Sequence, residues 1–234
     1  MKAVVLAGGL GMRLQPYTTI VPKPLFPVGE VPIIEVILRR LRAHGFETVD
    51  VCLGHLGELI QAYFAETSKI PDGLQVHWHR EREPLGTAGA LSTVGGLDAT
   101  FLAMNGDILT TLDLGALLEF HVAAQAALTV AMRREHVDIG LGVIEAVDGR
   151  VTAYREKPAL DLTVSMGVYV YEPRALEHLP GGPCQFPELV QRLLDAGEHV
   201  AAYESDAEWF DIGTFEDHER AARFVDRHPG ILDA

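Results

Sequence analysis

Short apolar runs alternate along the first half of the chain with segments whose apolar residues recur every three or four positions. Runs of the first kind are typical of buried strands, and segments of the second kind are typical of amphipathic helices. The predicted strands cover residues 2–7, 48–54, 74–79 and 99–106, and the predicted helices cover residues 31–45, 56–66, 86–94 and 114–126. This βαβαβαβα order predicts a parallel sheet with helices on both faces, so ligands are expected outside the carboxyl ends of the strands.

The pattern changes after about residue 127, where strands follow one another. The predicted strands cover residues 127–134, 140–158 and 162–173, and the second contains Asp148-Gly149, a dipeptide typical of a tight hairpin turn. We expect these strands to extend or flank the sheet. A helix over 186–197, a strand over 199–205 and a helix over 215–228 follow. The fold class is therefore expected to be α/β: one domain with a Rossmann-like three-layer αβα sandwich and a mainly parallel mixed sheet.

Composition and charge narrow the range of functions. The chain has 234 residues, of which 48% are hydrophobic and 22% charged, as in ordinary globular proteins. A formal net charge of −14 argues against a nucleic-acid surface, because phosphate backbones require clustered Lys and Arg. No apolar stretch approaches the ~20 residues of a membrane helix, and no signal-peptide pattern opens the chain, so a cytoplasmic location without membrane partners is expected. Cys52 and Cys184 are isolated and are interpreted as packing residues in a reducing compartment.

A glycine-rich turn follows the first predicted strand. It is not a Walker A loop, and Leu14 stands where a dinucleotide fingerprint needs its third glycine. What remains is a set of backbone N–H groups from Gly8, Gly9 and Gly11, with Arg13 just beyond them. Two glycines alone would favour tight packing as the explanation, but together with the arginine they indicate a site that holds a triphosphate.

Lys23 lies between Pro22 and Pro24. Flanking prolines stiffen a segment and remove N–H donors, so this lysine is interpreted as aimed at a ligand rather than as an ordinary surface charge.

Two aspartates lie in otherwise apolar surroundings. Asp107 comes at the end of a predicted strand, and Asp211 lies between Phe210 and Ile212. Burying carboxylates is costly unless they bind something positive, and Mg²⁺ is commonly held by one or two carboxylates together with substrate phosphates. A Mg²⁺ site therefore fits the two residues, while a turn or helix cap is the simpler explanation for a lone Asp.

Six segments together resemble the sugar-1-phosphate nucleotidylyltransferases, the pyrophosphorylases that make nucleotide sugars. They occur in the family's order and span nearly the whole chain: LAGGLGMRLQPYTTIVPKPLFPVG at 6–29, EPLGTAGAL at 83–91, NGD at 105–107, REKP at 155–158, SMGVY at 165–169 and WFDIGT at 209–214. The resemblance implies the nucleotide-diphospho-sugar transferase fold over residues 1–234, without the C-terminal left-handed β-helix of some relatives. Ser165 departs from the asparagine that many members have at the sugar site.

The resemblance also implies a role for each candidate site residue. Nucleotide binding is expected of Leu6, Gly8, Gly9, Gly11, Gly86 and Thr87; sugar-phosphate binding of Gly142, Glu156, Lys157 and Ser165; catalysis of Arg13, Lys23 and Lys157; and Mg²⁺ binding of Asp107 and Asp211. Without the family match, the Glu156–Lys157 pair would be interpreted as a solvated ion pair at a strand end.

The expected reaction transfers a nucleotidyl group from a nucleoside triphosphate to a sugar 1-phosphate and releases pyrophosphate. Glu81 or Glu83 could accept hydrogen bonds from the N1–H and N2–H₂ groups of guanine, which favours GTP with mannose or heptose 1-phosphate. Uridylyl or thymidylyl transfer to another sugar and a non-catalytic regulatory subunit stay open as alternatives. A dinucleotide-dependent oxidoreductase is disfavoured by Leu14. A homo-oligomer is left open.

Overall fold

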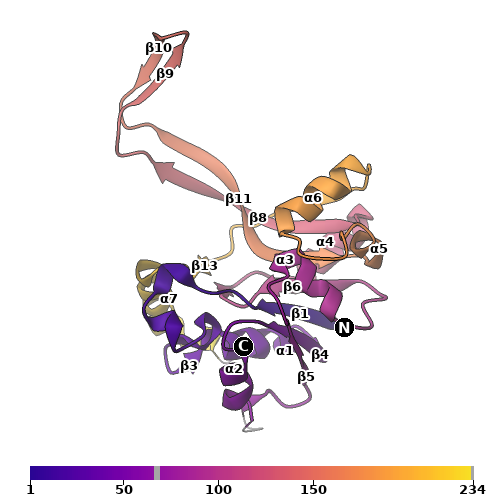
Figure 1. Cartoon of the computed structure of the whole chain (residues 1–234). Helices are drawn as coiled ribbons and strands as arrows, with labels where there is room; N and C mark the ends of the chain where they lie inside the picture. Colours follow the sequence, from indigo (N-terminus) through magenta and orange to yellow (C-terminus); the bar gives the residue numbers. More distant parts are fainter. Residues whose placement is uncertain (66–68, 233–234) are drawn as a thin grey trace.

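A seven-stranded mixed sheet forms the centre of the computed structural model, which describes residues 1–65 and 69–232 (Figure 1). The strands lie in the order β12-β8-β11-β6-β1-β4-β5, and β11 runs antiparallel to both of its neighbours while the other neighbouring pairs are parallel. Their bounds are Lys2–Ala7 (β1), Thr48–Leu53 (β4), Gln75–Arg80 (β5), Phe101–Asn105 (β6), Leu128–Asp138 (β8), Ala159–Tyr171 (β11) and Val200–Glu204 (β12). The predicted mainly parallel mixed sheet is confirmed.

Helices cover both faces of this sheet. They are α1 (Ile33–Ala43), α2 (Gly57–Tyr63), α3 (Gly86–Gly89), α4 (Leu114–Ala124), α5 (Pro173–Leu176), α6 (Phe186–Asp195) and α7 (Phe215–Arg227). Side chains of a strand alternate between the two faces, so Val5 of β1 joins the core under α1, α4 and α7, while Val4 joins the core under α3, α5 and α6. The predicted three-layer αβα sandwich is confirmed. The last residue of the helix predicted over 56–66 lies outside the described residues.

Two short ladders lie outside the main sheet, and both matter for the site. Strand β7 (Ile108–Thr110) pairs antiparallel with β13 (Trp209–Asp211), and β2 (Pro27–Val28) pairs with β3 (Val31–Pro32). Five short 3₁₀ turns are also described: η1 (Met12–Leu14), η2 (Tyr17–Thr19), η3 (Lys23–Leu25), η5 (Ala90–Thr93) and η6 (Pro229–Ile231). These turns and ladders carry residues far apart in the sequence to one end of the sheet.

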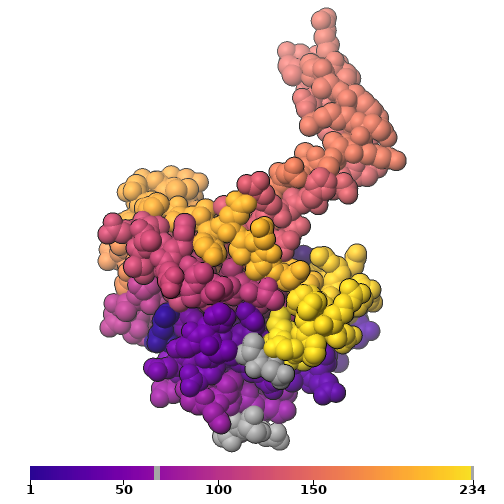
Figure 2. Space-filling model, turned by 180° about the vertical axis from the view of Figure 1, so that it is seen from behind, coloured from indigo at the N-terminus to yellow at the C-terminus, as the bar shows by residue number. Residues whose placement is uncertain are grey.

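The strands β8 and β11 run well past the sheet and end in a hairpin that stands away from the body (Figures 1 and 2). The hairpin consists of β9 (Val143–Val147) and β10 (Arg150–Arg155). Its turn is the predicted Asp148-Gly149, and both residues have a positive φ, 47° and 76°. The tight turn is confirmed, but β9 and β10 form a ladder of their own rather than a part of the sheet.

Both cysteines are buried and free, as expected of packing residues. Burial raises the pKa of the Cys52 thiol to about 12, which makes it unreactive. Among the described residues, no helix has the length and apolar character needed to cross a membrane.

Candidate active site

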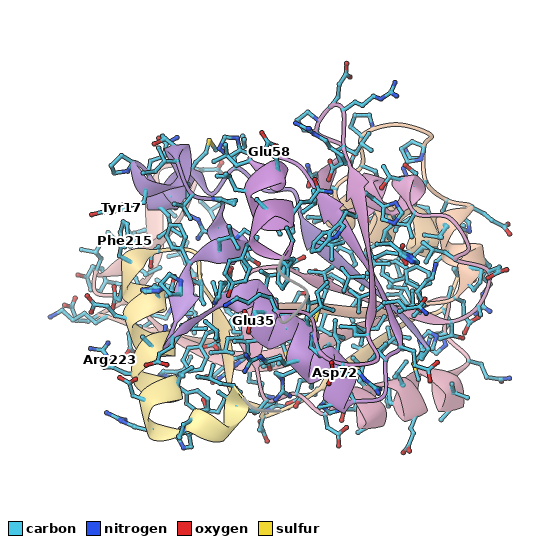
Figure 3. All side chains as sticks on the ribbon, turned by 90° about the horizontal axis from the view of Figure 1, so that it is seen from below. Tyr17, Glu35, Glu58, Asp72, Phe215 and Arg223 are labelled. Atoms are coloured by element: carbon cyan, nitrogen blue, oxygen red, sulfur yellow. The ribbon has the colours of Figure 1, made fainter. Side chains whose placement is uncertain are left out.

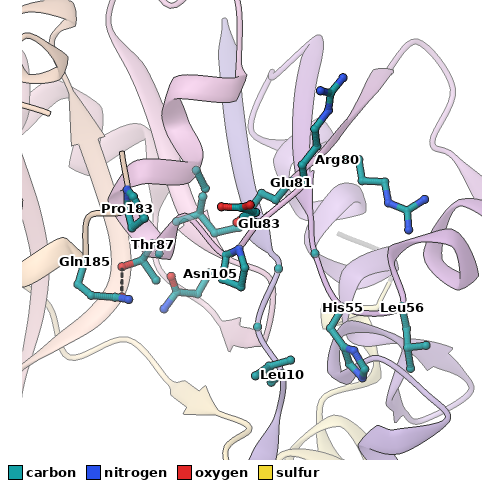
Figure 4. A pocket seen from close by; sticks show the side chains of 18 of the residues that line it. Leu10, His55, Leu56, Arg80, Glu81, Glu83, Thr87, Asn105, Pro183 and Gln185 are labelled. Carbon is teal, nitrogen blue, oxygen red and sulfur yellow. Dashed lines mark hydrogen bonds between the residues drawn. The ribbon is translucent and has the colours of Figure 1, made fainter. Parts of the chain in front are cut away.

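A cavity of about 1130 Å³ opens at the carboxyl ends of the parallel strands (Figure 4). Its lining comes from the turn after β1, the turn after β4, the segment after β5, the start of α3 and the end of β6. The loop before α6 closes the remaining side. This volume slightly exceeds that of common small-molecule pockets, so it has room for a nucleotide and a second substrate.

The three glycines after β1 differ in what surrounds them. A Cβ added to Gly8 would lie 2.6 Å from a carboxylate oxygen of Glu81, whereas one added to Gly9 would meet nothing within 4 Å. Gly8 and Gly9 line the cavity, as does Leu6. Gly11 has a φ of +60°, and a Cβ there would lie 2.8 Å from the methyl carbon of Thr18. Gly11 therefore shapes the turn, and Gly9 faces the space where a ligand could bind.

Gly86 and Thr87 form part of the cavity wall on the other side from the glycine turn. Gly86 has a φ of +75°, and a Cβ on it would lie 2.6 Å from the carbonyl oxygen of Cys184. The Thr87 hydroxyl accepts a hydrogen bond of 2.9 Å from the backbone N–H of Phe186 and lies 3.5 Å from the side-chain oxygen of Gln185 (Figure 4). The start of α3 is thus tied to the loop that begins α6.

Asp107 and Asp211 are brought together by the pairing of β7 with β13. Asp211 lies opposite Ile108 in that ladder, and the backbone oxygen of Asp107 accepts a hydrogen bond of 3.2 Å from the N–H of Ile212. The Lys23 ammonium donates to Asp107 and lies 3.5 Å from a carboxylate oxygen of Asp211. The structure therefore places three separately predicted residues in one cluster.

Burial raises the pKa of Asp211, and the nearby Asp107 carboxylate raises it further. Lys23 and Arg13 act in the opposite direction. The carboxylate oxygens of Asp107 and Asp211 match the ligands that Mg²⁺ prefers. Groups of three or more His, Cys, Asp or Glu that could hold a metal do not occur in the described part of the chain. The pair therefore fits a magnesium ion whose other ligands are phosphates and water.

Arg13 completes the positive side of this cluster. A Cβ added to Gly213 would lie 2.7–2.8 Å from the guanidinium atoms of Arg13, so the arginine lies close against the backbone that follows β13. Asp107 belongs both to this cluster and to the lining of the cavity. The glycine turn and the charged cluster are therefore parts of one site.

A family profile described as "Nucleotidyl transferase" matches residues 2–228. This chain belongs to that family.

Two curated members of the family show the range of substrates among the relatives of this chain. It is 32% identical to the UTP–glucose-1-phosphate uridylyltransferase of Synechocystis over 96% of its own length. It is 33% identical to the mannose-1-phosphate guanylyltransferase of Mycobacterium tuberculosis over 95% of its length. The chain spans only 63% and 64% of these two relatives.

A solved structure gives the corresponding comparison of folds. Crystalline HddC from Yersinia pseudotuberculosis superposes with a TM-score of 0.75 at 23% identity, covering 95% of this chain and 98% of that one. This similarity, together with the sheet order, confirms the expected fold.

The predicted sugar-phosphate residues do not lie together. Ser165 is at the root of the projecting strands, 3.4 Å from the hydroxyl of Tyr169, whose pKa is raised by burial and also, to a smaller extent, by Asp107 and Asp211. Gly142, Glu156 and Lys157 lie next to the hairpin and are exposed. A Cβ on Gly142 would collide with the hydroxyl of Tyr154, which donates a hydrogen bond of 2.9 Å to Glu156. The structure thus keeps these three residues away from the cavity lining.

Asn105 is a site residue that the sequence prediction did not assign. It lines the cavity, and its side-chain oxygen is buried with no hydrogen-bond partner among the residues described. Leaving such an atom unpaired is costly, which distinguishes Asn105 from the other residues that line the cavity. Its position directly before Gly106 and Asp107 in the NGD motif was the available signal.

Proposed function

We propose that this chain transfers a nucleotidyl group from a nucleoside triphosphate to a sugar 1-phosphate. The observation that carries the proposal is the position of Asp107, which lies in the wall of the cavity and in the ion-pair cluster with Lys23 and Asp211. A cavity with a bare glycine turn on one side and paired carboxylates and cations on the other suits a ligand whose phosphates lie between them.

The attacking group needs little activation. A sugar 1-phosphate loses its second proton near pH 6, so its oxygen is already largely anionic at neutral pH. The residues of this chain then have to position the reactants and neutralise charge. We assign the backbone N–H groups of Gly8 and Gly9 to the triphosphate, and Arg13 to the pyrophosphate, where negative charge grows as it leaves. Lys23 steadies the same phosphates.

Asp107 and Asp211 would hold a magnesium ion, which supplies charge neutralisation to the phosphates when bound. Both carboxylates already face one cation, the Lys23 ammonium. The arrangement thus offers oxygen donors where positive charge is favoured, and these are the donors that the ion requires.

GTP with mannose or heptose 1-phosphate is the proposed substrate pair. Glu81 and Glu83 both line the cavity (Figure 4). One oxygen of Glu81 accepts a hydrogen bond of 2.9 Å from the N–H of Leu85, which orients the carboxylate and leaves its second oxygen beside Gly8. Acceptors at this wall suit the N1–H and N2–H₂ donors of guanine, which uracil does not present in that pattern. The guanylyltransferase relative agrees with this choice, and the uridylyltransferase relative supports the alternative.

The test is a matrix of nucleoside triphosphates against sugar 1-phosphates with Mg²⁺, in which pyrophosphate release is measured. We expect the highest kcat/KM with GTP and a manno-configured sugar 1-phosphate. Highest turnover with UTP or dTTP would refute the assignment of the base. Tight binding of nucleotide sugars by calorimetry without turnover in any combination would replace the enzyme by a regulatory subunit.

A further inference from the structure

Residues 133–165, here called the arm, include no buried residue. The arm consists of the outer parts of β8 and β11 and the β9–β10 hairpin, and it projects from the body in both Figures 1 and 2. In the described part of the chain, the side-chain hydrogen bonds and ion pairs of residues 136–162 join members of that segment to one another. A two-stranded hairpin is marginally stable in water by itself, so this segment needs a surface to cover it.

The hairpin has one apolar face. Four side chains share this face in two directly opposed pairs: Ile144 with Tyr154 and Ala146 with Val151. Ile144, Val151 and Tyr154 are 56%, 66% and 60% exposed. The opposite face is mixed, because it carries the ion pair between Arg155 and Glu145 at 3.0 Å together with valines and an alanine. When the two faces of an antiparallel pair differ in this way, the more apolar face normally packs against a protein core.

A second set of exposed apolar side chains, here called the rim patch, belongs to the body and follows the glycine turn of the candidate site in the sequence. It consists of residues from the turns after the glycine loop and from the start of α7: Met12, Tyr17, Ile20 and Phe215, which are 69%, 57%, 70% and 43% exposed. The rings of Tyr17 and Phe215 meet edge to face with centroids 5.1 Å apart (Figure 3). Arg13 directly follows Met12, so a partner on this patch would lie next to the phosphate-binding residues.

The arm of the same copy is held away from this patch. Its strands pair without interruption from Asp138 opposite Ala159 down to Met132 opposite Ser165. Ser165 lies six positions after Ala159 along the strand, which corresponds to about 20 Å at ~3.3 Å per residue. Lys157 lies beyond even that distance, although the resemblance to the nucleotidylyltransferases implies that it binds the sugar phosphate. With Lys157 in that role, the site of one copy is incomplete and its arm is unused.

Charge permits the arm to approach another body. The arm has five Lys or Arg and six Asp or Glu, a formal charge of −1, whereas the whole chain carries −14. Two bodies repel each other, but a nearly neutral arm that carries Lys157 meets little repulsion from an acidic body.

We propose that two copies of this chain exchange arms, so that the apolar hairpin face of each copy covers the rim patch of the other and Lys157 enters the other's site. The exchange is reciprocal, so it closes as a two-fold dimer and leaves neither apolar surface exposed. The role of Lys157 in this arrangement rests on the proposed function, whereas the exchange of arms does not.

The first test mixes two inactive variants, Asp107→Asn, which damages the body, and Lys157→Ala, which damages the arm. The two proteins are co-expressed with different tags, and the doubly tagged pairs are quantified. In an arm-exchanged pair, the Lys157→Ala body receives an intact arm and forms one intact site. Random pairing should therefore restore about a quarter of the wild-type rate at sugar concentrations below KM. If mixed pairs are present but no activity is recovered, each arm serves the body of its own copy.

The matched control mixes Asp107→Asn with Asp211→Asn. Both changes lie on the body, so no mixed pair contains an intact site and no recovery is expected. Equal recovery in this control would mean that pairing rescues activity by another route and would overturn the interpretation.

The second test does not depend on turnover, so it holds even if the proposed function fails. Cys52 and Cys184 are buried, so Tyr154→Cys introduces one accessible thiol, to which a photo-reactive benzophenone is attached. Pairs containing one ¹⁵N-labelled and one unlabelled copy are irradiated and digested. Cross-links between the arm of one copy and residues 10–20 of the other are expected. Cross-links confined to a single copy, or a monomer at micromolar concentration in sedimentation, would refute the exchange.

The hairpin provides a further matched pair of variants. Ile144→Lys places a charge on the apolar face, and Val147→Lys places one on the other face at a similar exposure, 62% against 56%. Ile144→Lys should shift the protein from dimer to monomer in sedimentation, and Val147→Lys should not. An equal effect of the two changes would show that the apolar face is not the contact.

Discussion

Gly9 and Gly11 lie two residues apart in the glycine turn, and the structure predicts opposite consequences for changing them. Gly11 is in the left-handed region at a φ of +60°, where a residue with a Cβ costs roughly 1–2 kcal/mol. The added Cβ would also lie 2.8 Å from the methyl carbon of Thr18, which is 2% exposed, and such overpacking costs typically about 1–3 kcal/mol. Gly11→Ala should therefore lower the free energy of unfolding by roughly 2–5 kcal/mol.

Thr18→Ser separates the two contributions. It removes the methyl carbon but keeps the hydroxyl, which donates a hydrogen bond of 2.9 Å to the backbone oxygen of Gly11. In that background Gly11→Ala should cost only the conformational part, roughly 1–2 kcal/mol. The four proteins form a double-mutant cycle, and urea unfolding followed by circular dichroism gives the coupling energy.

Gly9→Val provides the contrast. Nothing lies within 4 Å of a Cβ at this position, which is exposed and lines the cavity. Its stability should change by no more than about 0.5 kcal/mol, while the added side chain occupies the space of the triphosphate. Nucleotide affinity measured by calorimetry should fall at least about tenfold, or roughly 1.4 kcal/mol. Unchanged affinity in Gly9→Val, or a coupling energy near zero between Gly11 and Thr18, would refute the assigned geometry of the turn.

Three further predictions follow from contacts in the site and the core. Asp107→Asn and Asp211→Asn should each lower kcat by orders of magnitude with an unchanged circular dichroism spectrum, and a kcat near wild type in excess EDTA would contradict the magnesium assignment. Gly86→Ala should lower the unfolding free energy by more than about 2 kcal/mol in urea titration, because it combines a positive φ with a Cβ 2.6 Å from the carbonyl oxygen of Cys184. Burial lowers the pKa of His121, so the unfolded chain binds a proton more readily than the folded one. Stability should therefore fall as the pH drops below about 6.5. His121→Gln should make Tm depend less on pH between pH 7.5 and 5.

Most of the sheet could be predicted from sequence because its central strands are largely apolar runs. After Lys2, β1 is entirely apolar, and the polar residues in β4 and β6 are few, so each run is long enough to be recognised without tertiary information. The strands β2, β3 and β7 were missed because two or three residues show no periodicity. These short ladders exist only because another part of the chain lies beside them.

The individual residues of the candidate site could be predicted from the sequence, but their arrangement in space could not. Lys23, Asp107 and Asp211 stood out by their chemistry, yet only the pairing of β7 with β13 places the two aspartates around one lysine. The position of Lys157 could not be read from sequence at all. The alternation in the hairpin predicts which side chains share a face, but it does not tell which surface covers that face.

The lysine between the two aspartates also has a consequence for the order in which ligands arrive. The free cluster holds two formal negative charges, Asp107 and Asp211, against two positive ones, Lys23 and Arg13. A divalent cation alone would leave excess positive charge, and a triphosphate alone would leave excess negative charge. Each ligand should therefore raise the affinity for the other by the same factor, as thermodynamic linkage requires. Calorimetric titration with Mg²⁺ should give weak binding to the free protein and much tighter binding in the presence of a non-hydrolysable triphosphate; equal affinities would mean that Lys23 does not compete with the ion.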